Sequence, residues 1–194
     1  MAIEEVRSFI AIELPENIKG RLGELQSRLQ SGKSRARWVA PESIHLTLKF
    51  LGSISVSSIP DVTGVMEEAA FGIPPFRLGV RGLGVFPDPR RVRVVWVGLD
   101  GELDELMQLQ KRLDSGLASL GFAPESRPFT AHLTLARMRD EASPAEREAI
   151  GQLVSAASFE AGDFSVESVS LMKSQLTREG AIYSRLASAA LTIV

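Results

Sequence analysis

The 194-residue sequence contains no cysteine and only two histidines. Without cysteine the chain cannot form a disulfide or offer a thiolate to a metal ion, which is compatible with a reducing compartment. No apolar run reaches the roughly 18 residues that a membrane-spanning helix requires. The first residues are acidic where a secretory signal is basic. We therefore expect a cytoplasmic protein with no membrane span.

An excess of basic charge is also absent. The net charge of −2 argues against a protein that binds nucleic-acid duplexes through a large basic surface. The chain is long enough for one domain with a sizeable core or for two small lobes. Two short basic clusters are expected to be solvated surface charge: Lys33, Arg35 and Arg37, and Arg90, Arg91 and Arg93.

Each histidine begins the same four-residue sequence, His-Leu-Thr-Leu, at His45 and again at His132. Side chains alternate between the two faces of a strand, so each histidine shares a face with the threonine two residues later, Thr47 or Thr134. The leucines then point into the core. If the two strands lie side by side or face one another, two imidazoles and two hydroxyls converge on one site.

The elements around the first motif recur in the same order around the second. The histidines are 87 positions apart (132 minus 45), and Phe9 to Val95 and Phe76 to Phe164 give 86 and 88. Each half has the order strand, helix, motif strand, helix, strand. This repeat predicts an α+β, bilobal, duplicated fold, with two antiparallel sheets related by a pseudo-twofold axis and helices on the outer faces.

We expect a single two-lobed domain over residues 1–194, with repeat 1 at about 7–86, repeat 2 at about 91–174 and a C-terminal strand at about 181–186. We also expect a monomer.

Apolar periodicity and turn residues predict the positions of the individual strands and helices. They predict strands at 7–14, 37–39, 44–51 (closed by Gly52), 76–86, 91–99, 129–137 and 164–171, and helices at 15–32, 58–71, 101–121 and 144–157.

A pair of histidines across one reacting atom can supply an acid and a base at once. Threonine hydroxyls on the same face can donate hydrogen bonds to non-bridging phosphate oxygens. A single strand histidine is more often structural, and a zinc site is the main alternative for the pair. Zinc would need a third ligand, but the sequence has no other histidine or cysteine and no acidic residue on the motif faces. The pattern favours metal-independent displacement at phosphorus, with no cofactor.

Three further residues are candidate substrate contacts. Lys49 shares the face of His45 by strand alternation and could meet a phosphate, with a salt bridge at the rim as the alternative. Trp38 could stack on a base, with a place in the core as the alternative. Arg137 lies off the active face by alternation, although strand ends twist.

The paired motifs resemble the two-histidine phosphoesterase superfamily, and within it the RNA 2′,3′-cyclic phosphodiesterases, also called 2′-5′ RNA ligases. The resemblance spans nearly the whole chain. It includes Arg7-Ser-Phe-Ile-Ala-Ile, Arg37-Trp38-Val39, His45 to Gly52, Gly82-Leu-Gly-Val-Phe-Pro87, His132 to Arg137 and Leu171 to Tyr183.

This resemblance implies a bilobal α+β fold with the site in the central cleft between the lobes. It also implies hydrolysis of an RNA 2′,3′-cyclic phosphate to a 2′-phosphomonoester, with 2′-5′ ligation as the reverse-type transfer. It implies that His45 is the proton donor and His132 the proton acceptor. One departure is Ala131, where the family usually has a proline. Two alternatives stay open: a phosphodiesterase for small cyclic phosphates such as an ADP-ribose derivative, and a non-catalytic nucleotide-binding module.

Overall fold

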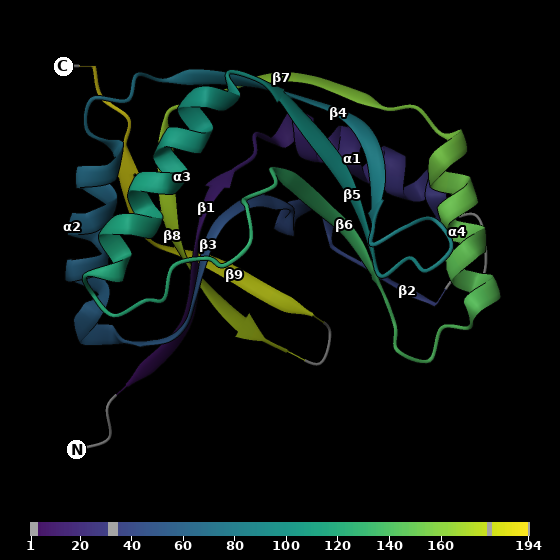
Figure 1. The fold of residues 1–194 in the computed structure, drawn as a ribbon, viewed down its shortest axis with the longest axis horizontal. Helices are drawn as coiled ribbons and strands as arrows, with labels where there is room; N and C mark the ends of the chain where they lie inside the picture. The colour runs from purple at the N-terminus through teal and green to yellow at the C-terminus, as the bar shows by residue number, and fades with distance from the viewer. Residues whose placement is uncertain (1–3, 31–34, 178–179, 194) are drawn as a thin grey trace.

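The computed structural model describes residues 4–30, 35–177 and 180–193 (Figure 1). Lys33 therefore lies outside the described residues. The described chain forms two antiparallel sheets, here called sheet A and sheet B. Sheet A has the strand order β3-β1-β8-β9 and sheet B the order β2-β6-β5-β4-β7. The predicted α+β class with two antiparallel sheets is confirmed.

The strands of sheet A are β1 (Glu5–Glu13), β3 (His45–Ser55), β8 (Ser168–Leu176) and β9 (Ala181–Ala190). Those of sheet B are β2 (Ala36–Trp38), β4 (Phe76–Phe86), β5 (Val94–Gly101), β6 (His132–Met138) and β7 (Glu160–Val166). The helices are α1 (Glu16–Leu29), α2 (Ile59–Ala70), α3 (Leu103–Ala118) and α4 (Pro144–Ala156), with short 3-10 turns at Pro41–Ser43 and Val56–Ser58.

Local sequence explains where the helices begin and which face they bury. Pro15 is the N-cap of α1, and the apolar positions that recur at helical spacing behind it are buried. The N-terminus of α4 is a capping box, in which Ser143 and Glu146 each accept a hydrogen bond from the other's backbone N–H. Helix propensity and apolar spacing thus agree with the observed elements.

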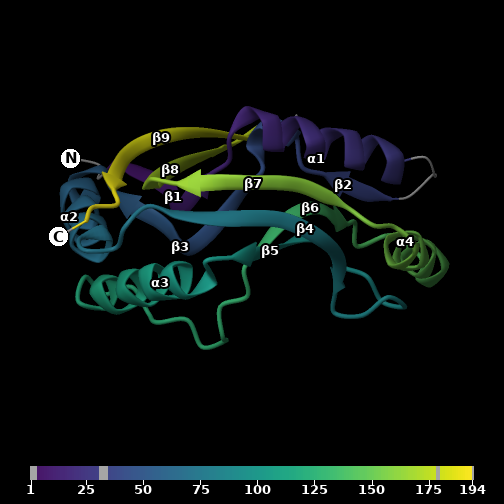
Figure 2. The same cartoon turned by 90° about the horizontal axis from the view of Figure 1, so that it is seen from above.

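The two repeats exchange elements rather than forming separate halves. Each motif strand pairs with the first strand of its own repeat, β3 with β1 and β6 with β5. The later strands cross over: β4 lies in sheet B and β8 in sheet A. The first helix of each repeat also packs on the other repeat's sheet, α1 against β7 and α3 against β3. Figure 2 shows α1 and α3 on opposite sides of the molecule.

The pseudo-twofold axis passes through the pairing of β4 with β7. Phe76 lies opposite Val166, and Leu78 lies opposite Phe164. The offset of 88 makes residue 76 equivalent to 164 and residue 78 equivalent to 166. Exchanging equivalent residues converts the pair 76–166 into the pair 164–78, which is also observed. The offset of 88 read from the sequence at these phenylalanines therefore marks a strand pair that lies on the axis.

The predicted strands differ from the structure most clearly at three places. The C-terminal strand expected at about 181–186 continues to Ala190 as β9. Strand β3 does not end at Gly52 but continues to Ser55, because Gly52 adopts a φ of 73° inside the strand at a register irregularity. The single strand expected at 164–171 is two strands, β7 and β8, which belong to different sheets. None of the helices in the described ranges is long and apolar enough to cross a membrane.

Candidate active site

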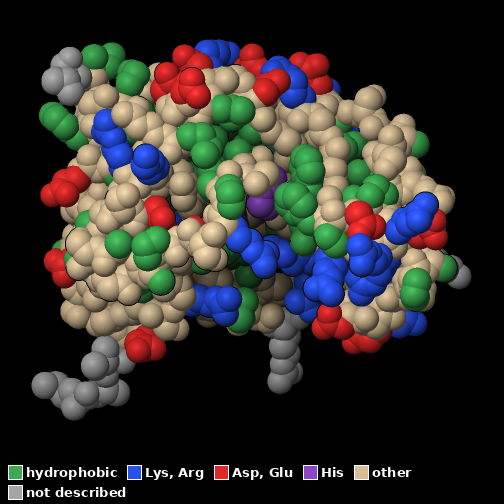
Figure 3. Space-filling model, in the orientation of Figure 1, with side chains coloured by type: hydrophobic (Ala, Val, Ile, Leu, Met, Phe, Trp, Pro, Cys, Tyr) green, Lys and Arg blue, Asp and Glu red, His purple; other side chains and the backbone are tan. Residues whose placement is uncertain are grey.

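The two motif strands meet although they belong to different sheets. Strand β3 carries His45 and Thr47, β6 carries His132 and Thr134, and the two strands contact each other. These four side chains are partly exposed, whereas the motif leucines are fully packed in the core. Figure 3 shows histidine atoms in a hollow near the centre of this face, which we call the cleft.

The same backbone contact holds each histidine ring. Nδ1 of His45 lies 2.8 Å from the carbonyl oxygen of Ser43, and Nδ1 of His132 lies 2.7 Å from that of Thr130. A carbonyl oxygen only accepts hydrogen bonds, so Nδ1 carries the hydrogen in both rings. Nε2 is then the nitrogen that accepts a proton when the ring is neutral and donates one when it is charged.

Aromatic side chains enclose His45. Phe9 stacks on its ring with centroids 4.5 Å apart, and Tyr183 meets it edge-on at 5.1 Å. This burial lowers the pKa of His45 from its ordinary value of 6.5, while the hydrogen bond to Ser43 and the negative charge of Glu13 raise the same pKa. His45 is therefore a desolvated imidazole whose proton affinity depends on its neighbours.

The hydroxyl of Tyr183 is influenced by charges from both sheets. Burial raises the pKa of its hydroxyl, and the positive charges of Arg137 and Arg7 act in the opposite direction. Arg137 belongs to β6 in sheet B, whereas Tyr183 belongs to β9 in sheet A. The guanidinium of Arg137 is thus close enough to act on a ring that touches His45.

The surroundings of His132 are different. Its ring meets Phe86 edge-on at 5.3 Å, and the residue opposite it in the β5–β6 pair is Gly98. The residue opposite His45 in the β1–β3 pair is Glu13. Two motifs with the same sequence and the same ring contact therefore have different neighbours, an acidic side chain at one and no side chain at the other.

A β-bulge lies at the last residue of both motifs. Leu48 has no partner in the register of β1 with β3, and Leu135 has none in the register of β5 with β6. The extra residue shifts the alternation of side chains beyond it. Strict alternation therefore assigns the wrong face to the residues that directly follow the bulge.

Lys49 is the first residue that the bulge displaces, and the structure contradicts its assignment to the active face. Its side chain is 2% exposed, and Nζ donates to Asp114 of α3 at 2.5 Å and to the carbonyl oxygen of Ala123 at 2.6 Å. The ammonium group is thus part of a buried contact between sheet A and α3. We correct the interpretation of Lys49 as a phosphate contact.

The same shift moves Arg137 onto the active face, the reverse of what alternation indicated. Arg137 is exposed, and its partner in the β2–β6 pair is Arg37. Directly opposed residues share a face, so both arginines lie on the cleft side. Within the described part of the chain neither guanidinium has an ion pair or hydrogen bond.

Trp38 packs against the hydrophobic core and is partly buried there. It lies next to Arg37 in β2, so the two side chains point to opposite faces. The structure therefore favours the core alternative for Trp38 over stacking on a base.

The hydroxyls of Thr47 and Thr134 have no hydrogen-bond partner among the residues that the structure describes. Over the same residues, no group of three His, Cys, Asp or Glu side chains is arranged to hold a metal ion. The arrangement thus presents two imidazoles, two available hydroxyls and two unpaired guanidiniums, which together suit an anionic phosphate ester.

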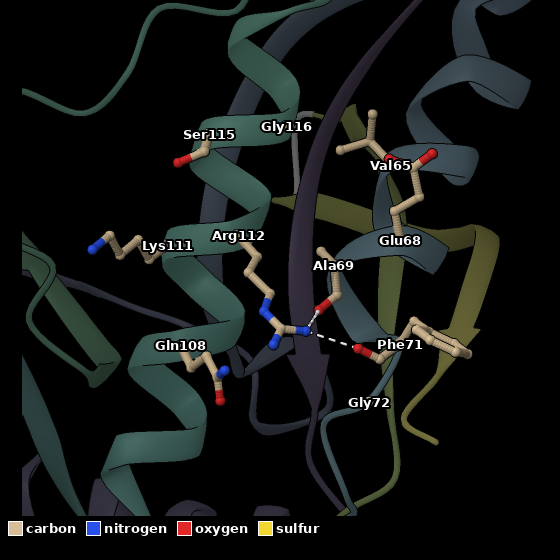
Figure 4. Close-up of a pocket in the computed structure, with 10 residues that line it drawn as sticks. All are labelled: Val65, Glu68, Ala69, Phe71, Gly72, Gln108, Lys111, Arg112, Ser115 and Gly116. Atoms are coloured by element: carbon tan, nitrogen blue, oxygen red, sulfur yellow. Dashed lines mark hydrogen bonds between the residues drawn. The ribbon is translucent and has the colours of Figure 1, made fainter. Parts of the chain in front are cut away.

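A separate pocket of about 840 Å³ lies between α2 and α3 (Figure 4). Arg112 donates there to the carbonyl oxygens of Phe71 and Ala69 and so caps the C-terminus of α2. Neither histidine lines this pocket. Although it is larger than a second pocket around residues 88–91, it lacks an acid–base pair and is not the active-site candidate.

Glu13, Tyr183 and Phe9 were not singled out from the sequence as site residues. Tyr183 and Phe9 lie within the stretches that carry the family resemblance, so that signal was available. Nothing in the order of residues identifies Glu13, because its place beside His45 depends on how β1 pairs with β3.

Comparison with known proteins agrees with this geometry. The family model described as LigT like Phosphoesterase matches the chain twice, at residues 12–96 and 97–183. Similar curated proteins include the RNA 2′,3′-cyclic phosphodiesterases of Methanothermobacter thermautotrophicus and Archaeoglobus fulgidus. The first is 35% identical over 93% of this chain and 96% of that protein, and the second is 34% identical over 93% and 98%.

Solved structures with the same fold include TT0787 of Thermus thermophilus and LigT of E. coli complexed with 3′-AMP. The former has a TM-score of 0.78 and 29% identity and covers 95% of this chain and 97% of that one. The latter has a TM-score of 0.78 and 28% identity and covers 97% and 99%. The duplicated fold expected from the repeat is confirmed.

Proposed function

The chain belongs to the LigT-like phosphoesterase family, and on this premise we propose that it hydrolyses RNA 2′,3′-cyclic phosphate ends to 2′-phosphomonoesters. The observation that carries the proposal is the matched pair of imidazoles, each with Nδ1 on a backbone carbonyl and Nε2 available. The names of the curated relatives supply the substrate class.

In the proposed reaction, water attacks phosphorus on the side opposite O3′. Nε2 of His132 removes a proton from the water, and Nε2–H of His45 protonates O3′ as the P–O3′ bond breaks. The product is a 2′-phosphomonoester with a free 3′-hydroxyl. Without protonation O3′ would leave as a costly alkoxide, so the acid and the base are both needed.

Thr47 and Thr134 would donate hydrogen bonds to the non-bridging oxygens, where negative charge gathers in the transition state. This role is supported by the absence of any competing hydrogen-bond partner for the two hydroxyls within the described residues. With a ribose 5′-hydroxyl in place of water, the same transfer would join two RNA ends through a 2′-5′ bond.

Arg137 and Arg37 would bind a phosphate of the RNA chain next to the reacting one. Like charges directly opposite in a strand pair repel each other, and a phosphate between the two guanidiniums would remove this repulsion. Guanidinium groups also match phosphate oxygens in geometry, with two parallel hydrogen bonds each.

The proposal includes one two-lobed domain that acts as a monomer. Each sheet is covered by a helix from the other repeat, so neither half would bury its own sheet alone. Both histidines also come from one chain, and the site needs no residue from a second copy.

An RNA oligonucleotide that ends in a 2′,3′-cyclic phosphate, assayed beside a cyclic mononucleotide, tests the proposal. Mass spectrometry should show a gain of one water, and comparison with authentic standards should identify a 2′-phosphate. The reaction should proceed in EDTA. A 3′-phosphate product would contradict the assignment of the broken bond, and activity lost in EDTA and restored by zinc would indicate a metal site. The absence of turnover on either substrate would favour a binding module.

A further inference from the structure

The two motifs pose a problem of symmetry, because the proposed reaction needs different roles from two equal histidines. The motifs share the same four residues, the same bulge and the same contact from Nδ1 to a carbonyl oxygen two residues earlier. Nothing within a motif therefore distinguishes an acid from a base. The difference must come from the residues that surround each ring.

The strand next to each motif supplies that difference. Glu13 is the partner of His45 across the β1–β3 pair, so both side chains lie on the cleft face. The corresponding partner of His132 across the β5–β6 pair is Gly98, which has no side chain. A glutamate at residue 98 would also be excluded by space, since a Cβ there would lie 2.9 Å from the carbonyl oxygen of Arg81.

Two contacts hold the carboxylate of Glu13 in place. Its Oε2 accepts a hydrogen bond from the hydroxyl of Ser170 at 2.8 Å and from Nε of Arg185 at 2.7 Å. Ser170 is 2% exposed and comes from β8, whereas Arg185 comes from β9 and is about half exposed. A residue from each of three neighbouring strands thus contributes to one fixed negative charge beside His45.

We propose that Glu13, held by Ser170 and Arg185, is a positioning residue that favours the protonated form of His45 and so assigns it the role of acid. The role of His45 as an acid rests on the proposed function. The electrostatic effect of Glu13 on His45 does not depend on whether the protein turns over a substrate. A carboxylate directly across a strand pair stabilises an imidazolium, and His132 has no such neighbour at residue 98.

The remaining charges near His45 set the context for this effect. Arg185 opposes it, because its guanidinium neutralises part of the carboxylate's charge. Burial by Phe9 and Tyr183 also opposes it, since a desolvated ring binds a proton less readily. Glu13 on β1 acts on His45 directly, and Arg185 on β9 pairs with Glu13. Tyr183 on β9 touches the ring, and Arg7 on β1 and Arg137 on β6 act on Tyr183. Strand β6, which contacts β3, also carries His132.

The presence of only two histidines permits a direct test by NMR. Histidine labelled with ¹³C at the ε1 position should give two titrating signals, and a His132→Gln variant assigns them. Glu13→Gln should lower the midpoint of His45 by roughly half a pH unit, as expected for unit charges about 5 Å apart in a water-like dielectric. Arg185→Gln should move the same midpoint upward, while the signal of His132 stays in place.

Glu24→Gln is the matched control, because it removes an exposed carboxylate that pairs with an arginine on its own helix, α1, and that is not among the charges acting on His45. It should move neither signal. An unchanged His45 midpoint in folded Glu13→Gln, or an equal shift of both signals, would overturn the proposal. If Glu13→Gln does not fold, the upward shift in the exposed Arg185→Gln variant decides the question instead.

Kinetics then separate this inference from the proposed function. The pH profile of kcat/KM for a cyclic phosphate reports the two protonation states of the free protein, and Glu13→Gln should shift it as the NMR midpoint shifts. If the NMR shifts occur but no cyclic phosphate is turned over, the proposed function fails while the electrostatic role of Glu13 stands. If a cyclic phosphate is turned over but the NMR shifts do not occur, the proposed function stands while the electrostatic role of Glu13 fails.

Discussion

Arg37 of β2 and Arg137 of β6 lie directly opposite each other, and Arg137 comes three residues after Thr134 of the second motif. Neither has an ion pair within the described residues, although the whole chain carries a net charge of −2. Two unpaired guanidiniums on one face at the edge of the cleft are the arrangement that the proposed binding of an RNA phosphate requires. Figure 3 shows basic side chains gathered beside the histidine hollow.

We expect Arg37→Gln and Arg137→Gln to raise KM for a cyclic-phosphate oligonucleotide, and Arg37→Gln to raise it far less for a cyclic mononucleotide. Each lost phosphate contact should reduce the slope of log KM against log salt by about 0.7, as for single strands. Arg28→Gln, an exposed change on α1, should change neither quantity. An unchanged salt slope in both arginine variants would show that no phosphate binds there.

His45→Ala and His132→Ala should each reduce kcat by about 10²–10⁴-fold, the usual contribution of one general acid or base. The two residues act on one transition state, so the double variant should lose far less than the product of the single losses. Steady-state rates on one cyclic-phosphate substrate measure this. Losses that multiply would indicate two independent roles.

A substrate with sulfur in place of the 3′ oxygen should rescue His45→Ala and not His132→Ala. A thiolate leaves without protonation, so the acid becomes dispensable while the base is still required. The rates of both variants on the sulfur and oxygen substrates give the comparison. Rescue of His132→Ala alone would reverse the two roles.

Lys49→Met should destabilise the fold with little effect on kcat/KM per folded molecule. The substitution leaves Asp114 without its buried partner, and removal of one member of a buried pair costs roughly 3 kcal/mol. Urea unfolding measures the change in the free energy of unfolding. Lys111→Met, an exposed change on the same helix as Asp114, should be close to neutral. A large loss of kcat/KM with unchanged stability would restore Lys49 as a substrate contact.

The free energy of unfolding should fall as the pH is lowered from about 6.5 toward the lowered pKa of His45. Burial holds the pKa of His45 in the folded protein below its ordinary value of 6.5, so the unfolded chain binds more protons in this range. The associated stability is complete above 6.5 and is lost as the pH falls toward the lowered pKa. Urea unfolding of His45→Gln should show a smaller slope with pH, whereas His132→Gln, which retains His45, should keep it. Equal slopes for wild type and His45→Gln would contradict the burial effect.

The sequence by itself determined the features that depend on local spacing. Alternation within His-Leu-Thr-Leu placed each histidine and threonine on one face and the leucines in the core. The offset of 87 residues between the motifs predicted a duplicated α+β fold. Apolar periodicity located all four helices to within a few residues, because the period of a helix is a property of one segment.

Only the tertiary structure decided the features that depend on pairing between segments. The bulges at Leu48 and Leu135 exist only relative to the neighbouring strands, and they turned Lys49 into the core and Arg137 into the cleft. The contrast between Glu13 and Gly98 also arises from register, since each is far from its histidine in the sequence. The alternation of residues is a property of one chain segment, whereas the face on which a residue lies and the residue opposite it depend on how two strands pair.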